Sequence, residues 1–150
     1  MNKTYRLSEV KLSYRTRLNP SNRVKINCPA DCYKLLLNHW DKGQMEHKES
    51  FKIILLNQSH TVLGIYHVSD GGISDTTVDV RLILQAAILS NASSLVLAHN
   101  HTSGNLKPSH NDSISTIRIK QAAALMGIKV YDHLIVCKDN YYSFANEGAL

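Results

Sequence analysis

The sequence of 150 residues has few of the features that mark secreted or membrane proteins. Its three cysteines are an odd number, without the dense disulfide framework of small secreted domains. No apolar run approaches the roughly 20 residues of a membrane-spanning helix, and the N-terminal stretch MNKTYRLSEV lacks the apolar core of a signal peptide. We therefore expect reduced thiols, a cytoplasmic location and no membrane contact.

Internal repeats and low-complexity segments are also absent, and the composition, 43% hydrophobic and 19% charged, is ordinary for a globular protein. The length suits one compact domain. A pair of cysteines in CPADC, Cys28 and Cys32, followed by His39, is a weak signal for a metal site because no second pair accompanies it. Ordinary buried or surface thiols are the simpler interpretation.

Negative charge is scarce in the first 27 residues, where seven Lys or Arg face one acid, Glu9. This segment carries +6, which leaves −1 for the remainder of a chain whose net charge is +5. A basic segment can follow a phosphate backbone, or it can be a solvated edge of the fold. Because no aromatic stacking pattern accompanies the cations, we expect at most weak DNA contact.

Hydrophobic periodicity predicts strands alternating with helices. In the first half of the chain, Val10 to Tyr14 suggests a strand, Pro29 suits the first turn of a helix over 30–40, and FKIILLN and TVLGIYHV form a hairpin. The second half is expected to contain helices over 79–91 and 109–127 and strands over 94–99, 128–136 and 141–144. In the later helix, the apolar face is expected to comprise Ile114, Ile117, Ala122, Leu125 and Met126. This order predicts an α/β fold, a single domain with a mixed central β-sheet flanked by helices.

The stretch LAHNHTSGNLKPSHND, residues 97–112, follows the buried strand directly. Side chains alternate along a strand, so His99 and His101 can project together while Asn100 faces away. The loop TSGNLKP can then return Asp112, in the first turn of the next helix, to the strand end. Two histidines and one carboxylate with a fourth position for water form a catalytic zinc arrangement.

A second interpretation of Asp112 stays open on spacing alone. Ser109-x-x-Asp112 is also a capping box, in which both side chains satisfy backbone donors at a helix start. The other histidines receive no role, because a lone histidine is usually a surface residue or a satisfied core residue: His39, His47, His60, His67, His110 and His133.

His99-x-His101, seven residues, Ser109-x-x-Asp112 and an upstream glutamate together resemble the JAMM metalloprotease signature of JAB/MPN domains. NASSLVLAHNHTSGNLKPSHND, followed by KVYDHLIV and YYSFANEG, resembles the RadC branch of that superfamily, in the short form found on bacterial mobile elements. The resemblance implies a cytidine deaminase-like architecture. It covers a RadC-like metal-binding domain over 45–150, preceded by a basic strand and short helix over 1–44.

The resemblance also implies roles for individual residues. Zinc would be bound by His99, His101 and Asp112, with water as the fourth ligand. Glu49, two positions before Phe51, matches the upstream acid and would act as general base, with Glu46 as a nearby alternative. Ser109 would donate a hydrogen bond to the developing oxyanion.

Two functions follow from these observations. The first is a zinc-dependent hydrolase that cleaves an amide or isopeptide bond in a protein or peptide. The second is a DNA-associated accessory factor of repair or recombination, whose metal site is structural or vestigial and needs neither Glu49 nor Ser109. HNH nucleases and nucleobase deaminases are excluded, because HNH is here one contiguous string and His-x-Glu with Pro-Cys-x-x-Cys is missing.

Overall fold

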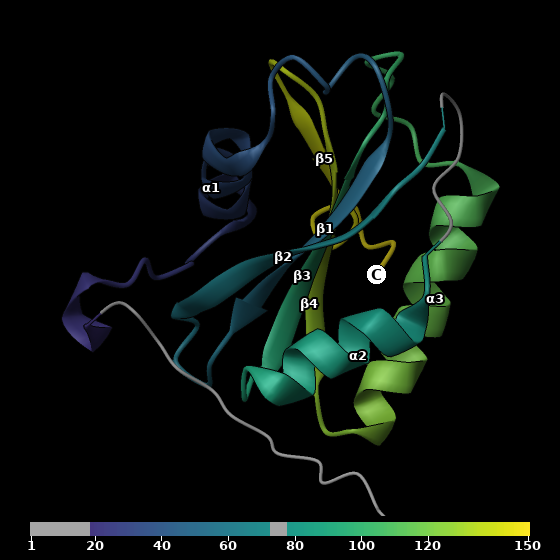
Figure 1. Cartoon of the computed structure of the whole chain (residues 1–150). Helices are drawn as coiled ribbons and strands as arrows, with labels where there is room; N and C mark the ends of the chain where they lie inside the picture. The colour runs from purple at the N-terminus through teal and green to yellow at the C-terminus, as the bar shows by residue number, and fades with distance from the viewer. Residues whose placement is uncertain (1–18, 73–77) are drawn as a thin grey trace, which may run out of the picture.

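The computed structural model describes residues 19–72 and 78–150, which form a β-sheet with helices on both faces (Figure 1). The sheet has the order β2-β1-β3-β4-β5. Its strands are β1 (Ser50–Leu56), β2 (Val62–Asp70), β3 (Ser94–Asn100), β4 (Lys129–Val136) and β5 (Tyr141–Ser143). β3 and β4 are parallel and the other neighbouring pairs are antiparallel, so the predicted α/β fold with a mixed central sheet is confirmed.

The two strands of the predicted hairpin, β1 and β2, pair along their whole length. β1 also pairs with β3, which places β3 between β1 and β4 in the middle of the sheet. All seven residues of β3 are buried, as expected for an apolar strand covered on both faces. β3, which precedes the histidine-rich loop, is therefore paired along both edges and covered on both faces.

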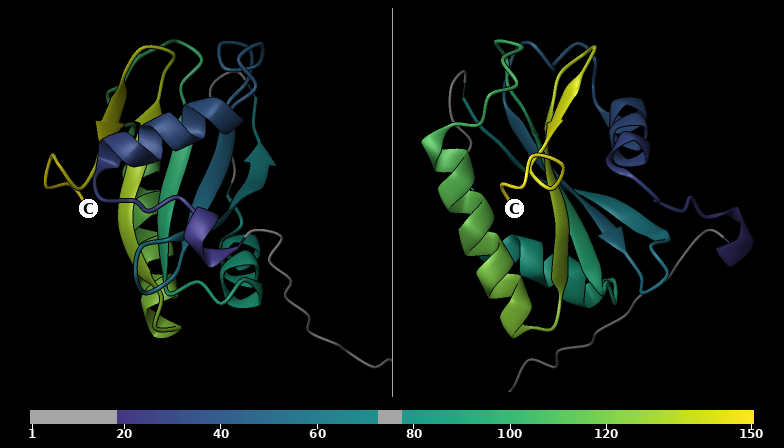
Figure 2. Two further views of the ribbon diagram at one scale, coloured as in Figure 1. Left: turned by 90° about the vertical axis from the view of Figure 1, so that its left-hand side faces the viewer. Right: turned by 180° about the vertical axis from the view of Figure 1, so that it is seen from behind.

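The helix α1 (Pro29–His39) covers one face of the sheet (Figure 2). Pro29 occupies its first position, as predicted, where a missing N–H costs nothing. Its buried side packs Cys32, Leu36 and the following Trp40 into an apolar cluster with strand residues such as Val96. α1 is thus part of the core of this domain.

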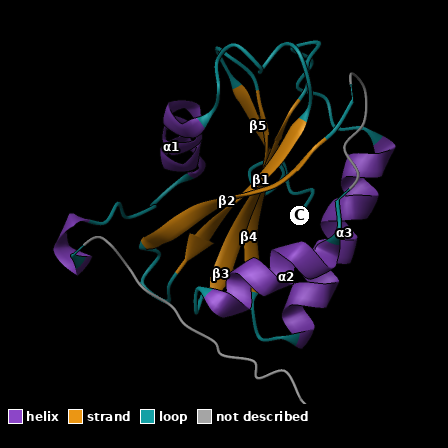
Figure 3. Ribbon diagram, in the orientation of Figure 1, coloured by secondary structure: helices purple, strands orange, loops and turns teal. Residues whose placement is uncertain are grey.

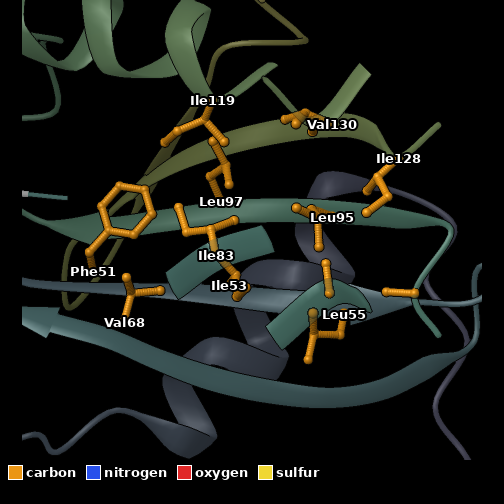
Figure 4. Packing of buried hydrophobic residues seen from close by; sticks show 13 residues of the cluster. Phe51, Ile53, Leu55, Val68, Ile83, Leu95, Leu97, Ile119, Ile128 and Val130 are labelled. Carbon is orange, nitrogen blue, oxygen red and sulfur yellow. The ribbon is translucent and has the colours of Figure 1, made fainter. Parts of the chain in front are cut away.

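The helices α2 (Val80–Leu89) and α3 (His110–Leu125) cover the opposite face (Figure 3). Between them and the sheet lies the second apolar cluster, in which Ile83 of α2 and Ile119 of α3 meet Ile53 and Leu97 of the strands (Figure 4). Phe51 belongs to this cluster, and its ring meets His99 near the end of β3 and His133 of β4.

The predicted apolar face of α3 is wrong. Ile114, Ile117, Leu125 and Met126 are between 50% and 89% exposed. The buried residues are instead Thr116, Ile119 and Ala123. These follow Asp112 at intervals of four, seven and eleven residues, so they share its side of the helix. The orientation of α3 therefore keeps the Asp112 side against the sheet and leaves four apolar side chains in solvent.

Most of the basic N-terminal segment, including the predicted strand at Val10 to Tyr14, lies outside the described residues. From residue 19 the chain forms a short 3-10 helix, Pro20–Asn22, and then meets the start of β2. The amide of Val62 donates to the carbonyl of Val24 over 2.8 Å, and Lys25 forms a β-bridge with Thr61. Residues 24–26 thereby extend the sheet edge.

Candidate metal centre

β3 delivers the first two residues of the predicted site. His99 is the sixth residue of this strand, pairs with Phe51 of β1 and Ile135 of β4, and is 3% exposed. Its ring stacks on Phe51 with a centroid distance of 6.1 Å and an interplanar angle of 4°. His101 follows directly after the strand. The two Nε2 atoms lie 3.0 Å apart, so the predicted common projection is observed.

The start of α3 brings the carboxylate to the same place. Asp112 Oδ1 lies 3.1 Å from His99 Nε2, and Asp112 Oδ2 lies 3.4 Å from His101 Nε2. Within residues 19–72 and 78–150, these three are the only group of three or more His, Cys, Asp or Glu side chains spaced to hold a metal ion. CPADC and His39 join no such group; His39 Nδ1 lies 2.9 Å from the Leu35 carbonyl.

The capping interpretation of Asp112 also holds. The Ser109 hydroxyl accepts a hydrogen bond from the Asp112 amide over 3.1 Å, and Asp112 Oδ2 accepts one from the Ser109 amide over 2.6 Å. The capping box is therefore complete. The same carboxylate begins α3 and faces both histidines, so the two interpretations are not exclusive.

The closest approaches among the three side chains fit zinc. With Zn–N and Zn–O bonds of about 2.0–2.1 Å, two ligands of a tetrahedral ion are about 3.3 Å apart. The two Nε2 atoms are 3.0 Å apart, and His99 and His101 approach Asp112 to 3.1 Å at Oδ1 and 3.4 Å at Oδ2, all close to this value. Two imidazole nitrogens and one carboxylate oxygen are also a donor set that zinc accepts, with one position left for water or substrate.

A hollow of about 440 Å³ opens beside the ligands, lined among others by Glu49, His101, Ser109 and Asp112. Glu49 precedes β1 and is buried, and its backbone pairs with Gly71 and Gly72 after β2. It also lines a small space of about 20 Å³ next to His99 and Asp112. Its place agrees with the predicted general base, although that role stays a prediction.

Glu46, the alternative acid, lies elsewhere. It is exposed and lines a separate hollow of about 190 Å³ on another side of His101, together with residues such as Met45 and Leu106. Asp112 and Ser109 do not line this second hollow. Of the two acids, only Glu49 shares a hollow with Asp112 and Ser109.

The charges of the site support an ionised carboxylate. Burial of Asp112 opposes its ionisation, but hydrogen bonds with His101 and His99 outweigh this and hold the pKa of Asp112 well below its usual range. The same contact with Asp112 raises the pKa of His101, against the effect of burial. Without metal, a proton on His101 is thus favoured, and a metal bound through its Nε2 would have to displace that proton.

Sequence reasoning missed two buried polar residues beside the ligands. His133 of β4, given no role above, is fully buried, and its Nε2 lies 2.8 Å from His99 Nδ1. Burial lowers the pKa of His133 well below its ordinary value, so its ring is neutral. Asn100 is also fully buried, and its side chain binds the backbone of Met45 and Lys48 before β1 and of Ser50 at its start.

Comparison with known proteins agrees with this geometry. The family model described as RadC-like JAB domain matches residues 26–149, which include α1. A UPF0758 protein of Porphyromonas gingivalis is 45% identical over 104 residues, 69% of this chain and 46% of that protein. A UPF0758 protein of Salinibacter ruber is 38% identical over 131 residues, covering 85% of this chain and 54% of its own.

A UPF0758 protein of Clostridium beijerinckii is 34% identical over 146 residues, 96% of this chain and 62% of that protein. The chain thus spans about half the length of the curated relatives it matches. None of the helices in the described residues is both long and apolar enough to span a membrane. With its mixed sheet, its group of candidate metal ligands between β3 and α3, and a family match over most of its length, this chain belongs to the RadC-like JAB domain family.

Proposed function

We propose that this protein is a zinc-dependent hydrolase that cleaves an amide or isopeptide bond in a protein or peptide substrate. One observation carries the proposal: His99, His101 and Asp112 converge with separations of 3.0–3.4 Å beside a hollow that also contains Glu49 and Ser109. A metal site that was only structural would not need a buried acid and a hydroxyl facing the same space.

Each residue has a distinct task in this proposal. His99, His101 and Asp112 would bind zinc, which supplies a Lewis acid that makes water nucleophilic near neutral pH. Glu49 would take the proton from the attacking water and pass it to the leaving amine. Ser109 Oγ already accepts from the Asp112 amide, so its own O–H is the group that would donate to the substrate carbonyl oxygen as that oxygen gains charge.

Metal analysis of two variants tests the ligand and base assignments without a known substrate. Asp112→Ala should lose zinc, because it removes one of three protein ligands. Glu49→Gln should keep a full complement of zinc, because the isosteric amide removes only the proton acceptor. Full zinc retention by Asp112→Ala would make the carboxylate a helix cap alone, and zinc loss in Glu49→Gln would make Glu49 a ligand.

The reaction itself is tested with zinc-loaded wild-type protein on a panel of peptide and isopeptide substrates. Hydrolysis by the wild type that is lost in Glu49→Gln, with zinc retained, supports the hydrolase. Hydrolysis that is equal in both proteins would remove Glu49 from the mechanism.

The basic segment over residues 1–27 supports a second, weaker proposal about partners. Seven cations without stacking residues would act through phosphate charge, so any DNA contact should be weak and independent of sequence. Such contact would accompany the hydrolase and does not require the metal site.

A further inference from the structure

A line of three hydrogen bonds runs behind the metal site and joins two of its ligands. His99 Nδ1 lies 2.8 Å from His133 Nε2, and His133 Nδ1 lies 2.6 Å from Thr116 Oγ1. The Thr116 hydroxyl in turn lies 2.6 Å from the backbone carbonyl oxygen of Asp112. The line therefore starts at a ligand on β3, crosses β4, and ends at the first turn of α3.

This line is held rigidly in the core. His133 and Thr116 are 0% and 1% exposed. The His133 ring stacks on Phe144 with a centroid distance of 4.8 Å and an interplanar angle of 13°, and it also meets Phe51 at 5.5 Å. Water has no access to these atoms, so each must find its hydrogen-bond partner within the protein.

The chemistry of the atoms determines the direction of every bond in the line. A carbonyl oxygen can only accept, so Thr116 donates its single hydrogen to Asp112. Thr116 Oγ1 can then only accept from His133, which places the proton of the neutral ring on Nδ1 and leaves Nε2 as an acceptor. His99 must therefore donate from Nδ1, and in the neutral ring that binds a metal its Nε2 keeps the lone pair.

His101 arrives at the same tautomer by a separate route. Its Nδ1 lies 2.6 Å from the carbonyl oxygen of Asn105 and must donate to it. Once His101 gives up the proton that it holds without metal, both Nε2 atoms point lone pairs toward the place where the Asp112 carboxylate also lies. The two imidazoles and the carboxylate then offer three acceptors to one cation.

We propose that Thr116 and His133 are positioning residues that set the tautomer and the ring orientation of His99, so that its Nε2 is available to a metal. This inference rests on the proposed metal site but not on the proposed hydrolysis. Neither residue touches the metal position. Their effect on metal affinity reaches His99 through hydrogen bonds: one separates His133 from His99, and two separate Thr116 from it.

The sharpest consequence concerns the Thr116 hydroxyl. In Thr116→Val the shape is nearly unchanged, but the Nδ1 proton of His133 loses its acceptor. Moving that proton to Nε2 relieves the loss, because Nε2 can donate to His99 Nδ1. His99 would then carry its own proton on Nε2, where a metal needs the lone pair. An isosteric change two hydrogen bonds from the metal should therefore weaken zinc binding.

Zinc affinity, measured by competition with a chromophoric chelator, tests this on Thr116→Val and on its matched control Thr116→Ser. Loss of an outer-shell partner typically costs about 10–100-fold in metal affinity, which is the decrease expected for Thr116→Val. Thr116→Ser keeps the hydroxyl and should bind zinc like the wild type. Equal affinities of the two variants would overturn the proposal.

A second measurement needs no variant and no metal. The ¹⁵N shifts of the histidine rings in metal-free wild-type protein should show His99 and His133 both protonated at Nδ1, and His133 unprotonated at Nε2. A proton on His133 Nε2 would overturn the proposal whatever the zinc result. Conversely, wild-type protein that shows these tautomers but binds no zinc would refute the proposed function and leave the hydrogen-bond line intact.

Discussion

Replacing Asn100 with Ala should destabilise the fold, because this side chain ties the segment before β1 to the end of β3. Its Oδ1 accepts from the Ser50 amide over 2.7 Å, and its Nδ2 donates to the carbonyls of Met45 and Lys48 over 2.7 and 2.9 Å. Asn100 is 0% exposed, so solvent cannot replace these bonds without local opening. The variant leaves three backbone groups without this partner.

The size of the effect follows from the three bonds. At about 1 kcal/mol of net stability per hydrogen bond, the loss is about 3 kcal/mol. For a chain of this length each kcal/mol lowers Tm by about 2–4 °C, so Asn100→Ala should melt about 6–12 °C below the wild type. Thermal and urea unfolding measure this loss of stability, and metal-free protein is used so that bound metal makes no contribution. Amide exchange should rise most in the segment over residues 45–50.

Asn38→Ala is the matched control, since Asn38 is exposed on α1. Its Tm should change little, because Ala is also the better helix former. Asn100→Asp is a stricter variant: near neutral pH its carboxylate would face the Met45 and Lys48 carbonyls, so it should be no more stable than Asn100→Ala. If Asn100→Ala melts like Asn38→Ala, or Asn100→Asp like the wild type, the assigned hydrogen bonds are wrong.

Three further predictions concern charge and packing. Because the contact with Asp112 raises the pKa of His101, this contribution to the stability of metal-free protein is complete below the ordinary histidine pKa of about 6.5 and is lost as pH rises through the raised value. As pH rises, the free energy of unfolding in urea should therefore lose this contribution in the metal-free protein. In the zinc-loaded protein it should rise, because the ligands deprotonate and bind the metal more tightly. Parallel pH profiles of the two proteins would contradict this prediction. Filter binding to DNA through residues 1–27 should be weak and fall steeply with salt, so tight binding at high ionic strength would favour the DNA-associated alternative. Ile119→Ala should cost about 2–5 kcal/mol in urea unfolding and Ile117→Ala at most about 0.5 kcal/mol, because their side chains are 1% and 54% exposed; equal costs would contradict the observed face of α3.

The convergence of His99, His101 and Asp112 could be predicted because the relevant geometry is local in sequence. His99 and His101 are two positions apart at a strand end, and Asp112 begins the next helix after one short loop. Strand alternation and the position of a helix start are sufficient to bring such residues together. The assignment of Glu49 needed the family resemblance, because nothing local connects it to a strand that lies 45 residues later.

His133 and Asn100 could not be predicted in the same way. His133 lies 34 residues from its partner His99, and Asn100 lies between 50 and 55 residues from its partners in the segment over residues 45–50. Periodicity identifies β4 as a strand, but it does not say that β4 lies parallel to β3 or which residues meet across the pair. A buried polar residue in an apolar strand was the available signal, and KVYDHLIV contains two.

The face of α3 shows a different limit. Apolar residues occur on several sides of α3, so its own sequence pattern does not determine which side is buried. Selection comes from the first turn, where Asp112 must face the histidines, and from Thr116, which must reach His133. The polar contacts at the start of the helix thus decide which of its isoleucines are buried.

Asp112 explains why a helix start and a metal site can occupy one position. Its Oδ2 accepts a hydrogen bond from the Ser109 amide, while its Oδ1 faces His99. The two contacts therefore use different lone pairs of one carboxylate. The positive end of the α3 dipole favours the charged carboxylate, and a charged carboxylate is what a metal requires. The backbone carbonyl of the same residue ends the hydrogen-bond line from His99. A shift of α3 along its axis would carry the cap with it, but it would move Asp112 away from the histidines and Thr116 away from His133. The proposed metal site therefore depends on the position of this helix against the sheet.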